Sequence, residues 1–394
     1  MISPFDQRLD RNIYPTIKWN RERIADTFGN SDALPFWVAD MDMLAPDAVI
    51  KSLIARAEHG IYGYEFRPDT LIDAFLAWYH ERHQWHINPI HIEQTPSILN
   101  AITILIDQQT DKNDGIIIQP PVFFEFNMVI KANQRQRVKN PLKLVDGRYE
   151  IDFDDLKEHA SQSRNKMMIV CNPHNPVGRV WTREELAQMA EICMRHDVLL
   201  VSDEIHGDIV YAPHTYTPLA SISDEIAQRT VTLVTPAKTF NLAGIVDAFA
   251  IIANDTYRER FHDFAHRFQI NKTNVFTSAA MLAAYREGGA WLDDVLAYLQ
   301  DNIAFIRDYL AQNIPQVKLV EPEGTYLIWL DFTALEIDPS DLATFLAQEA
   351  GLALNAGHWF GREGAGYARM NIAAPRRLIE EGLARLAKAV QNRH

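Results

Sequence analysis

Three short polar segments each follow an apolar, strand-like stretch, and each carries a side chain that could do chemistry. The segments read CNPHNPVGR at 171–179, VSDEIH at 201–206 and TPAKTFNLAG at 235–244. They place Asn175, Asp203 and Lys238 just beyond the ends of three successive predicted strands. Open α/β sheets bind ligands at the carboxyl ends of their strands, so we expect these side chains to converge on one site.

An amine, a carboxylate and an amide at one sheet edge match the needs of pyridoxal 5′-phosphate. Lys238 would form a Schiff base with this cofactor, and Asp203 would pair with its pyridinium nitrogen. A carboxylate at a buried strand end costs free energy unless it is paired, and the pyridinium would pair it. The alternative for Asp203 is a helix N-cap, which the positions of Asn175 and Lys238 on either side of it disfavour.

Further polar residues near these strand ends could hold other parts of the cofactor. Asn175 lies in a turn made rigid by two prolines and could donate to the phenolic oxygen, although an Asn-Pro turn without function is the alternative. His206 follows Asp203 by three residues and could face the same oxygen, although a histidine without a functional role is an equal alternative. The segment TPSILN at 95–100 opens a predicted helix, whose N-terminus suits a phosphate. The hydroxyl of Thr235 could add a donor there.

Arg369 is the candidate for binding a substrate carboxylate. It lies in a strand-like run at 367–372, and a guanidinium matches a carboxylate in bidentate geometry. A salt bridge on a small sheet is the alternative. His80, His83 and His86 are spaced three residues apart, but no acid or cysteine completes a ligand set beside them, so we expect no metal site.

Length and composition limit the class of protein. The 394 residues exceed the usual size of a single core, and 47% hydrophobic with 23% charged residues is an ordinary globular composition. A net charge of 38 − 52 = −14 disfavours nucleic acid as a partner. No apolar run of about 20 residues predicts a membrane span. Two cysteines and no recognisable signal peptide indicate the cytoplasm.

The order of the predicted elements indicates an α/β fold with a mostly parallel sheet and a second, smaller α+β domain. We predict an N-terminal segment at 1–45 that packs with the small domain, a large cofactor-binding domain at 46–288 and a small domain at 289–394. Helices are predicted at 97–110, 182–196 and 291–312. Strands of the large sheet are predicted at 115–119, 167–171, 198–202, 231–234 and 249–253.

The chain resembles the fold-type I pyridoxal-phosphate enzymes, the aspartate aminotransferase-like superfamily. Within it, the chain is most similar to the MalY- and PatB-like cystathionine β-lyase branch of bacterial carbon–sulfur lyases. The resemblance runs nearly end to end. Besides the three segments above, the motifs that carry it are LPFWVADMD at 34–42, HGIYGY at 59–64, PEGTY at 322–326, LALN at 352–355 and RMNIAAP at 369–375.

The resemblance implies a role for each candidate residue. Lys238 and Asp203 keep the roles given above, and Asn175 and His206 bracket the phenolic oxygen. The remaining residues would contact the phosphate (Ser97, Ile98, Thr235, and Tyr64 from the other subunit of a homodimer with shared active sites), stack on the ring (Phe123) or bind the substrate carboxylate (Arg369 with Ala39 and Asn355).

The resemblance also implies the reaction, which is α,β-elimination from L-cystathionine or a related cysteine S-conjugate to homocysteine or another thiol, pyruvate and ammonia. A class I/II aminotransferase is the alternative, because it needs the same Lys, Asp and Arg. Six positions depart from the branch, which commonly has Tyr at Phe123, Gly at Ser97, Pro at Asn100 and Ser at Ala237; Asp247 and Phe249 depart as well. A regulator without activity is disfavoured because the chain retains Lys238 and Asp203.

Overall fold

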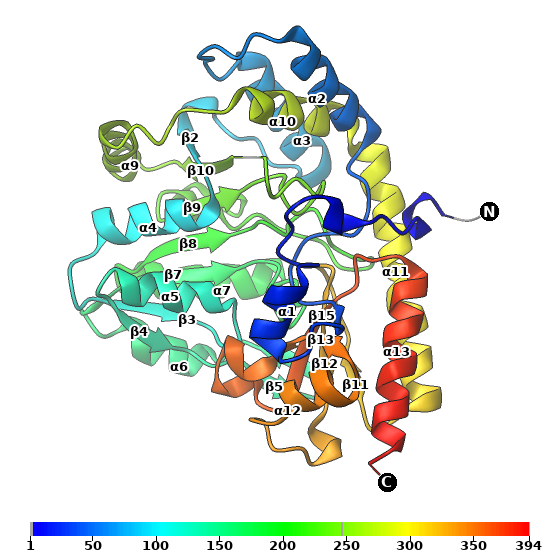
Figure 1. Ribbon diagram of the computed structural model, residues 1–394. Coiled ribbons are helices and arrows are strands. Elements are labelled where there is room, and N and C mark those ends of the chain that lie inside the picture. The colour runs from blue at the N-terminus through cyan, green and yellow to red at the C-terminus, as the bar shows by residue number, and fades with distance from the viewer. Residues whose placement is uncertain (1–2, 246, 394) are drawn as a thin grey trace.

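A seven-stranded sheet lies at the centre of the computed structural model, which describes residues 3–245 and 247–393 (Figure 1). The strand order is β2-β10-β9-β8-β7-β3-β4. Neighbours from β4 to β9 are parallel, whereas β10 is antiparallel to both β9 and β2. This arrangement confirms the predicted α/β fold. The strands are β2 (Ile92–Thr95), β3 (Gly115–Ile118), β4 (Gln136–Lys139), β7 (Asn165–Cys171), β8 (Leu199–Asp203), β9 (Thr230–Val234) and β10 (Ala248–Ile252).

Helices cover both faces of this sheet, because its strands alternate their apolar side chains between the two faces. Along β8, Leu199 and Val201 pack with one helix layer, and Leu200 packs with the other. The first layer contains α4 (Ile98–Gln109), α5 (Phe124–Ala132) and α9 (Asp255–Arg267). The second contains α6 (Phe153–Ala160) and α7 (Arg183–Arg195), with α8 (Asp224–Ala227) beside it. The end of the sheet at β9 and β10 packs with α2 (Asp47–His59), α3 (Asp69–His83) and α10 (Val275–Glu287).

A second sheet, with order β11-β12-β15-β14, is antiparallel throughout. It shares a core with two long helices, α11 and α13, which lie side by side in Figure 1. The elements of this part are α11 (Gly289–Asn313), β11 (Lys318–Val320), β12 (Leu327–Asp331), α12 (Leu342–Thr344), β14 (Asn355–Ala356), β15 (Tyr367–Asn371) and α13 (Arg376–Gln391). A further hairpin is formed by β5 (Lys143–Val145) and β6 (Arg148–Glu150).

The N-terminal segment packs against this second sheet and its helices. After α1 (Arg21–Phe28), β1 (Leu34–Pro35) pairs in parallel with β13 (Leu352–Ala353). Phe5 and Phe36 are buried in the core that contains α11 and α13. The exact division of the chain at residues 45 and 288 remains a prediction.

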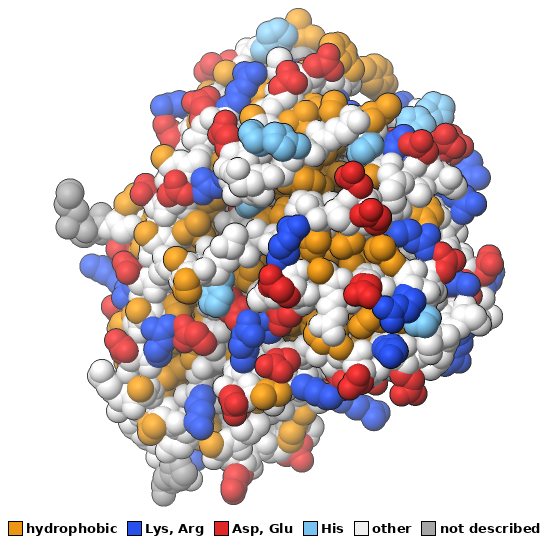
Figure 2. All heavy atoms as spheres, turned by 180° about the vertical axis from the view of Figure 1, so that it is seen from behind, with side chains coloured by type: hydrophobic (Ala, Val, Ile, Leu, Met, Phe, Trp, Pro, Cys, Tyr) orange, Lys and Arg blue, Asp and Glu red, His pale blue; other side chains and the backbone are white. Residues whose placement is uncertain are grey.

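The face of the molecule drawn in Figure 2 carries both positive and negative side chains. On the face in Figure 2, Lys and Arg side chains alternate with Asp and Glu, and apolar side chains lie among them. None of the helices in the described part of the chain is both long and apolar enough to cross a bilayer.

Local sequence determines where α7 begins, and this is testable. Thr182 accepts a hydrogen bond from the Glu185 N–H, and the Glu185 carboxylate accepts one from the Thr182 N–H. Thr182→Ala removes half of this capping box, so we expect it to lower the free energy of unfolding by about 1 kcal/mol in urea titrations. Gln188→Ala, an exposed change in the same helix, is the control. Equal losses in both variants would contradict a role for the cap.

Candidate active site

The carboxyl ends of β7, β8 and β9 open into a cavity of about 220 Å³. The structure brings together at this cavity every predicted site residue except Tyr64, Asn355 and Arg369. The residues that line it are Ala39, Ser97, Ile98, Phe123, Asn175, Asp203, His206, Thr235 and Lys238, together with Pro96, Leu99, Glu125, Cys171, Ile205, Ala237, Ala243 and Asp247.

Asp203 is the last residue of β8 and is buried at the base of this cavity. Its Oδ1 accepts a hydrogen bond of 3.2 Å from the Ile205 N–H. Burial raises the pKa of Asp203 to about 7, although the Ile205 N–H and the charge of Lys238 act in the opposite direction. A cationic N–H donor in the cavity would stabilise the carboxylate form, because an opposite charge favours ionisation.

Lys238 enters the cavity from the turn that follows β9. Its Nζ donates a hydrogen bond of 2.6 Å to the main-chain oxygen of Ala39. Burial lowers the pKa of Lys238 to about 8, and the positive charge of Arg369 adds to this, while Asp40 and Asp203 oppose it. A lysine with this pKa has a substantial neutral fraction near pH 7–8, which is the form that acts as nucleophile or base.

Arg369 lies on β15 of the smaller sheet, and its guanidinium is held by neutral groups. Nη1 donates to Asn175 Oδ1 at 3.0 Å, and Nη2 donates to Asn355 Oδ1 at 2.8 Å and to the Trp37 main-chain oxygen at 2.9 Å. Among the described residues no carboxylate pairs with Arg369, so the salt bridge considered from the sequence is not found. The buried Nε has no partner within the same residues.

A buried guanidinium without a counter-ion is suited to an anionic ligand. Burial lowers the pKa of Arg369 to about 10, so the group is still charged at neutral pH. The guanidinium carbon of Arg369 lies over the Phe360 ring, 4.9 Å from its centroid, which adds a cation–π contact to the three hydrogen bonds. A ligand carboxylate would therefore meet a cation whose orientation is already set.

His206 and Asn175 offer neutral polar groups to the cavity. Burial lowers the pKa of His206 to about 3, so its ring is uncharged at neutral pH, and its buried Nδ1 has no hydrogen-bond partner among the described residues. The Oδ1 of Asn175 accepts from Arg369, which leaves its Nδ2 as the donor toward a ligand. Both side chains line the cavity.

The N-terminus of α4 forms another wall. Ser97 is its N-cap, with Oγ accepting from the Asn100 N–H at 3.2 Å, so the first N–H groups of the helix are directed at the cavity. Thr235 Oγ1 donates to the Asp247 main-chain oxygen at 2.9 Å and accepts from the Ala237 N–H at 3.3 Å. The hydroxyl of Thr235 is thus already engaged as a donor.

Sequence reasoning did not assign Glu125, Cys171 and Asp247 to the site, although all three line the cavity. Burial raises the pKa of Glu125, opposed by Lys238 and Arg369. Its position in the first turn of α5, two residues after Phe123, is a signal that could have been used. Burial also raises the pKa of Asp247, and a hydrogen bond from Gln94 opposes that rise. An ionised carboxylate at this position would repel a phosphate bound beside it.

Tyr64 does not reach this cavity within one chain. Its side chain is fully exposed and borders a separate hollow with Tyr62, Lys272 and Phe276. Asn355 lies one step back from the cavity, since it contacts Arg369. The role of Tyr64 in a partner's site remains a prediction.

Comparisons with known proteins agree with the geometry. Residues 38–386 match the family model for aminotransferase class I and II. The chain is 37% identical over 386 residues to the cystathionine beta-lyase PatB of Bacillus subtilis (strain 168), covering 98% of this chain and 99% of PatB. It is 32% identical to the protein MalY of Escherichia coli (strain K12), covering 98% of each chain. The crystal structure of cystalysin from Treponema denticola, which contains pyridoxal 5′-phosphate, superimposes with a TM-score of 0.96 at 33% identity and covers 100% of both chains.

The raised pKa of Asp203 predicts how the stability of the ligand-free protein depends on pH. A carboxyl group whose pKa is higher in the folded state stabilises that state fully below about pH 4 and loses this contribution as the pH rises to about 7. Asp203→Asn cannot ionise, so we expect it to be more stable than the unchanged protein at pH 8, by roughly 1–4 kcal/mol, and about equally stable at pH 4. Thermal unfolding across this range is the measurement. Curves that coincide at pH 8 would contradict the prediction.

Proposed function

Because the chain belongs to the class I and II aminotransferase family, we propose that it is a pyridoxal 5′-phosphate-dependent carbon–sulfur β-lyase. Its substrate would be L-cystathionine or a related cysteine S-conjugate, which it would cleave to a thiol such as homocysteine, pyruvate and ammonia. One observation carries the proposal: Lys238 and Asp203 line one cavity, and the Arg369 guanidinium, which has no carboxylate partner among the described residues, contacts Asn175 in its wall. The chain is similar to PatB and MalY over almost its whole length.

The residues of the cavity fit the cofactor. Lys238 would bind it covalently, Asp203 would hold its ring nitrogen and Phe123 would cover the ring. The N-terminus of α4 offers N–H groups to its phosphate. The Nδ1 of His206, which has no partner among the described residues, and the amide of Asn175 suit its polar ring substituent. When bound, pyridoxal 5′-phosphate withdraws electrons from the α-carbon of an amino acid joined to it.

The protein's own groups would bind the substrate and move its protons. Arg369 would hold the α-carboxylate in the orientation set by Asn175 and Asn355. Lys238, whose pKa is lowered to about 8, would take the proton from the α-carbon. The thiolate would then leave from the β-carbon. Phe123 cannot donate a proton to that thiolate, because its ring has no hydroxyl.

A class I/II aminotransferase is the second candidate, and the family match supports it as well. It would use Lys238, Asp203 and Arg369 in the same places. The difference is the atom to which Lys238 returns the proton, which is a carbon of the cofactor in transamination. The similarity to PatB, a cystathionine beta-lyase, favours the lyase. Products, rather than rates, separate the two candidates.

We further propose a cytoplasmic homodimer in which each chain completes the other's site. Large apolar side chains are exposed on α2 and the segment that follows it, namely Ile54, Ile61, Tyr62, Tyr64 and Phe66. Exposed apolar groups of this size favour burial by a partner surface. Cys171 and Cys193 are both buried as free thiols, which suits a reducing compartment.

Replacing Lys238 tests the reaction. We expect Lys238→Ala to lower the rate of thiol release from L-cystathionine by at least about 10³-fold. The variant lacks the amine that would both bind the cofactor covalently and take the α-proton. Thiol and pyruvate are measured in parallel, with and without a 2-oxo acid acceptor. Lys112→Ala, an exposed lysine, is the matched control.

The unchanged enzyme should release thiol and pyruvate in equal amounts, whether or not the acceptor is present. Amino transfer that requires the acceptor, without thiol, would replace the lyase by the aminotransferase. Full thiol release by Lys238→Ala would exclude the proposed role of this lysine.

Mixing two defective variants tests the shared site. Tyr64→Ala and Lys238→Ala are each expected to be impaired as homodimers. In a hybrid dimer, one site has both residues intact if Tyr64 acts across the interface. Random 1:1 reassembly should then restore about a quarter of the activity, since half of the dimers are hybrids with one intact site. No recovery in hybrids isolated by two affinity tags would contradict a shared site.

A further inference from the structure

The segment 37–42 connects the N-terminal strand β1 to the active-site cavity. Side chains from elsewhere in the chain hold it in place by donating hydrogen bonds to its main-chain carbonyl groups. It belongs to no sheet, yet five successive main-chain oxygens accept hydrogen bonds from side chains elsewhere in the chain. The donors are Arg369 to Trp37 (2.9 Å), Asn371 to Val38 (2.7 Å), Lys238 and Tyr326 to Ala39 (2.6 and 2.9 Å), Asn371 and Lys18 to Asp40 (2.6 and 3.1 Å), and Asn241 to Met41 (3.0 Å).

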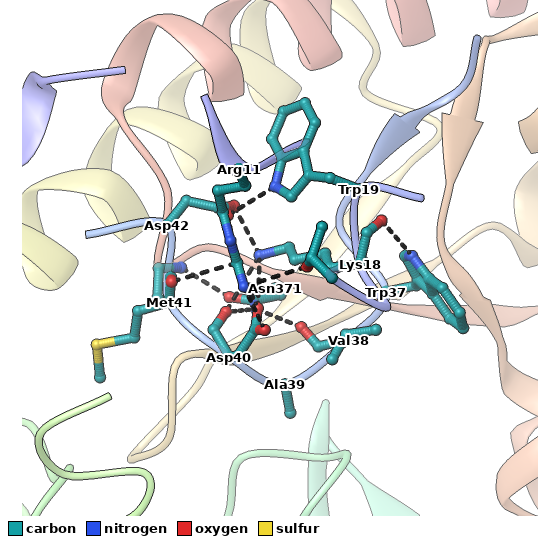
Figure 3. Close-up of polar contacts among 12 residues, drawn as sticks. Arg11, Lys18, Trp19, Trp37, Val38, Ala39, Asp40, Met41, Asp42 and Asn371 are labelled. Carbon is teal, nitrogen blue, oxygen red and sulfur yellow. Dashed lines mark hydrogen bonds and ion pairs between the residues drawn. The ribbon is translucent and has the colours of Figure 1, made fainter. Parts of the chain in front are cut away.

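Two of these carbonyls hold the residues that would do the chemistry. The Ala39 oxygen accepts from the Lys238 amine, and the Trp37 oxygen accepts from the Arg369 guanidinium. Ala39 also lines the cavity, and Figure 3 shows its side chain pointing away from the polar cluster behind it. The position of segment 37–42 therefore sets both the base and the carboxylate-binding group.

Behind the segment, two cations from the N-terminus pair with its two carboxylates (Figure 3). Arg11 binds Asp40 through two nitrogens, at 2.8 and 2.9 Å, and reaches Asp42 at 2.7 Å. Lys18 Nζ lies 2.7 Å from Asp42 Oδ2 and 3.5 Å from Asp40 Oδ1. The side chain of Lys18 is 0% exposed, and that of Arg11 is 24% exposed.

The same cluster is tied together by indole groups. Trp37 Nε1 donates to the Lys18 main-chain oxygen at 3.0 Å, and Trp19 Nε1 donates to Asp42 Oδ1 at 2.8 Å. The N-terminal segment and segment 37–42 thus fix each other from both sides. Burial would raise the pKa of Asp40, but Arg11 and Lys18 together lower it, so the Asp40 carboxylate is held as an anion.

A buried cluster of this kind contributes geometry more than stability. Removing charged groups from water costs about as much as their attraction returns, and well-packed apolar side chains often stabilise a fold equally well. What apolar residues cannot supply is a bidentate hold on Asp40 that fixes the direction of the neighbouring carbonyl groups. Displacing a catalytic group by about 1 Å can cost 10²-fold in rate.

We propose that Arg11 and Lys18 are positioning residues of the active site, which fix segment 37–42 so that the Ala39 and Trp37 carbonyls hold Lys238 and Arg369. The proposal rests on the proposed function in one respect: Lys238 must bind the cofactor and Arg369 the substrate. Neither Arg11 nor Lys18 touches the cavity itself.

The test compares two variants of the cluster with a matched control. Arg11→Gln removes the bidentate pair, and Lys18→Met keeps the length of the side chain without its charge. Arg21→Gln removes an exposed ion pair of the same N-terminal segment, with Asp32 at 3.6 Å, that does not contact segment 37–42. Each holoenzyme is measured for kcat and KM with L-cystathionine, for the visible circular dichroism of the bound cofactor, and for thermal unfolding.

We expect Arg11→Gln and Lys18→Met to lower kcat/KM by about 10- to 100-fold and to weaken the visible circular dichroism, with unchanged far-ultraviolet spectra. Arg21→Gln should behave as the unchanged enzyme, and Arg11→Lys should recover part of the loss. Variants that unfold at lower temperature but keep kcat/KM and the visible signal would overturn the proposal, since their role would then be structural alone.

The positioning role can be tested even if the lyase proposal fails or if one variant does not fold. If the unchanged enzyme releases no thiol, the lyase proposal fails, but the visible circular dichroism still decides the positioning role, because it needs cofactor and no substrate. If Lys18→Met does not fold, Arg11→Gln decides alone, because Arg11 lies at the edge of the cluster.

Discussion

Desolvation of three ionisable side chains is the constraint on which this structure depends. Asp203 and Arg369 are buried and Lys238 is partly buried, and among the described residues none of the three forms an ion pair. Burial raises the pKa of Asp203 and lowers the pKa of Lys238 and Arg369, so it favours the neutral form of each. The fold tolerates this cost because neutral groups, chiefly amides and main-chain carbonyls, satisfy the hydrogen bonds. A ligand that carries both a cationic and an anionic group could therefore pair with Asp203 through the first and with Arg369 through the second.

The architecture explains why these groups can be brought together. Lys238 and Asp203 come from the ends of parallel strands in the large sheet, and Arg369 comes from the antiparallel sheet. Segment 37–42 lies between the two and contacts both, through Lys238 on one side and Asn371 on the other. A site assembled from two sheets needs such a connection, because neither sheet alone fixes the distance between the Lys238 amine and the Arg369 guanidinium.

The sequence predicted the parts of this site that depend on local patterns. All five predicted strands of the large sheet lie within two residues of β3, β7, β8, β9 and β10, and the cap at Thr182 is where its spacing placed it. The row of held carbonyls was not predicted, because its donors are distant in sequence; Asn371 and Val38 are separated by 333 residues. Every residue type also has a main-chain oxygen, so the use of that oxygen as an acceptor cannot be recognised from the sequence. Asp247 was missed because a single acidic residue carries no pattern of its own, whereas the position of Glu125 just after Phe123 was a usable signal.

The use of main-chain oxygens as acceptors has a consequence for how this protein can change. A substitution at Ala39 or Val38 replaces a side chain but leaves the carbonyl that holds Lys238 or accepts from Asn371. Laboratory evolution could therefore reshape the wall of the cavity at Ala39 without deleting the hydrogen-bond acceptor for Lys238. An insertion or deletion in the same segment would instead shift every acceptor out of register with its donor. Segment 37–42 can therefore change its side chains, but it cannot change its number of residues.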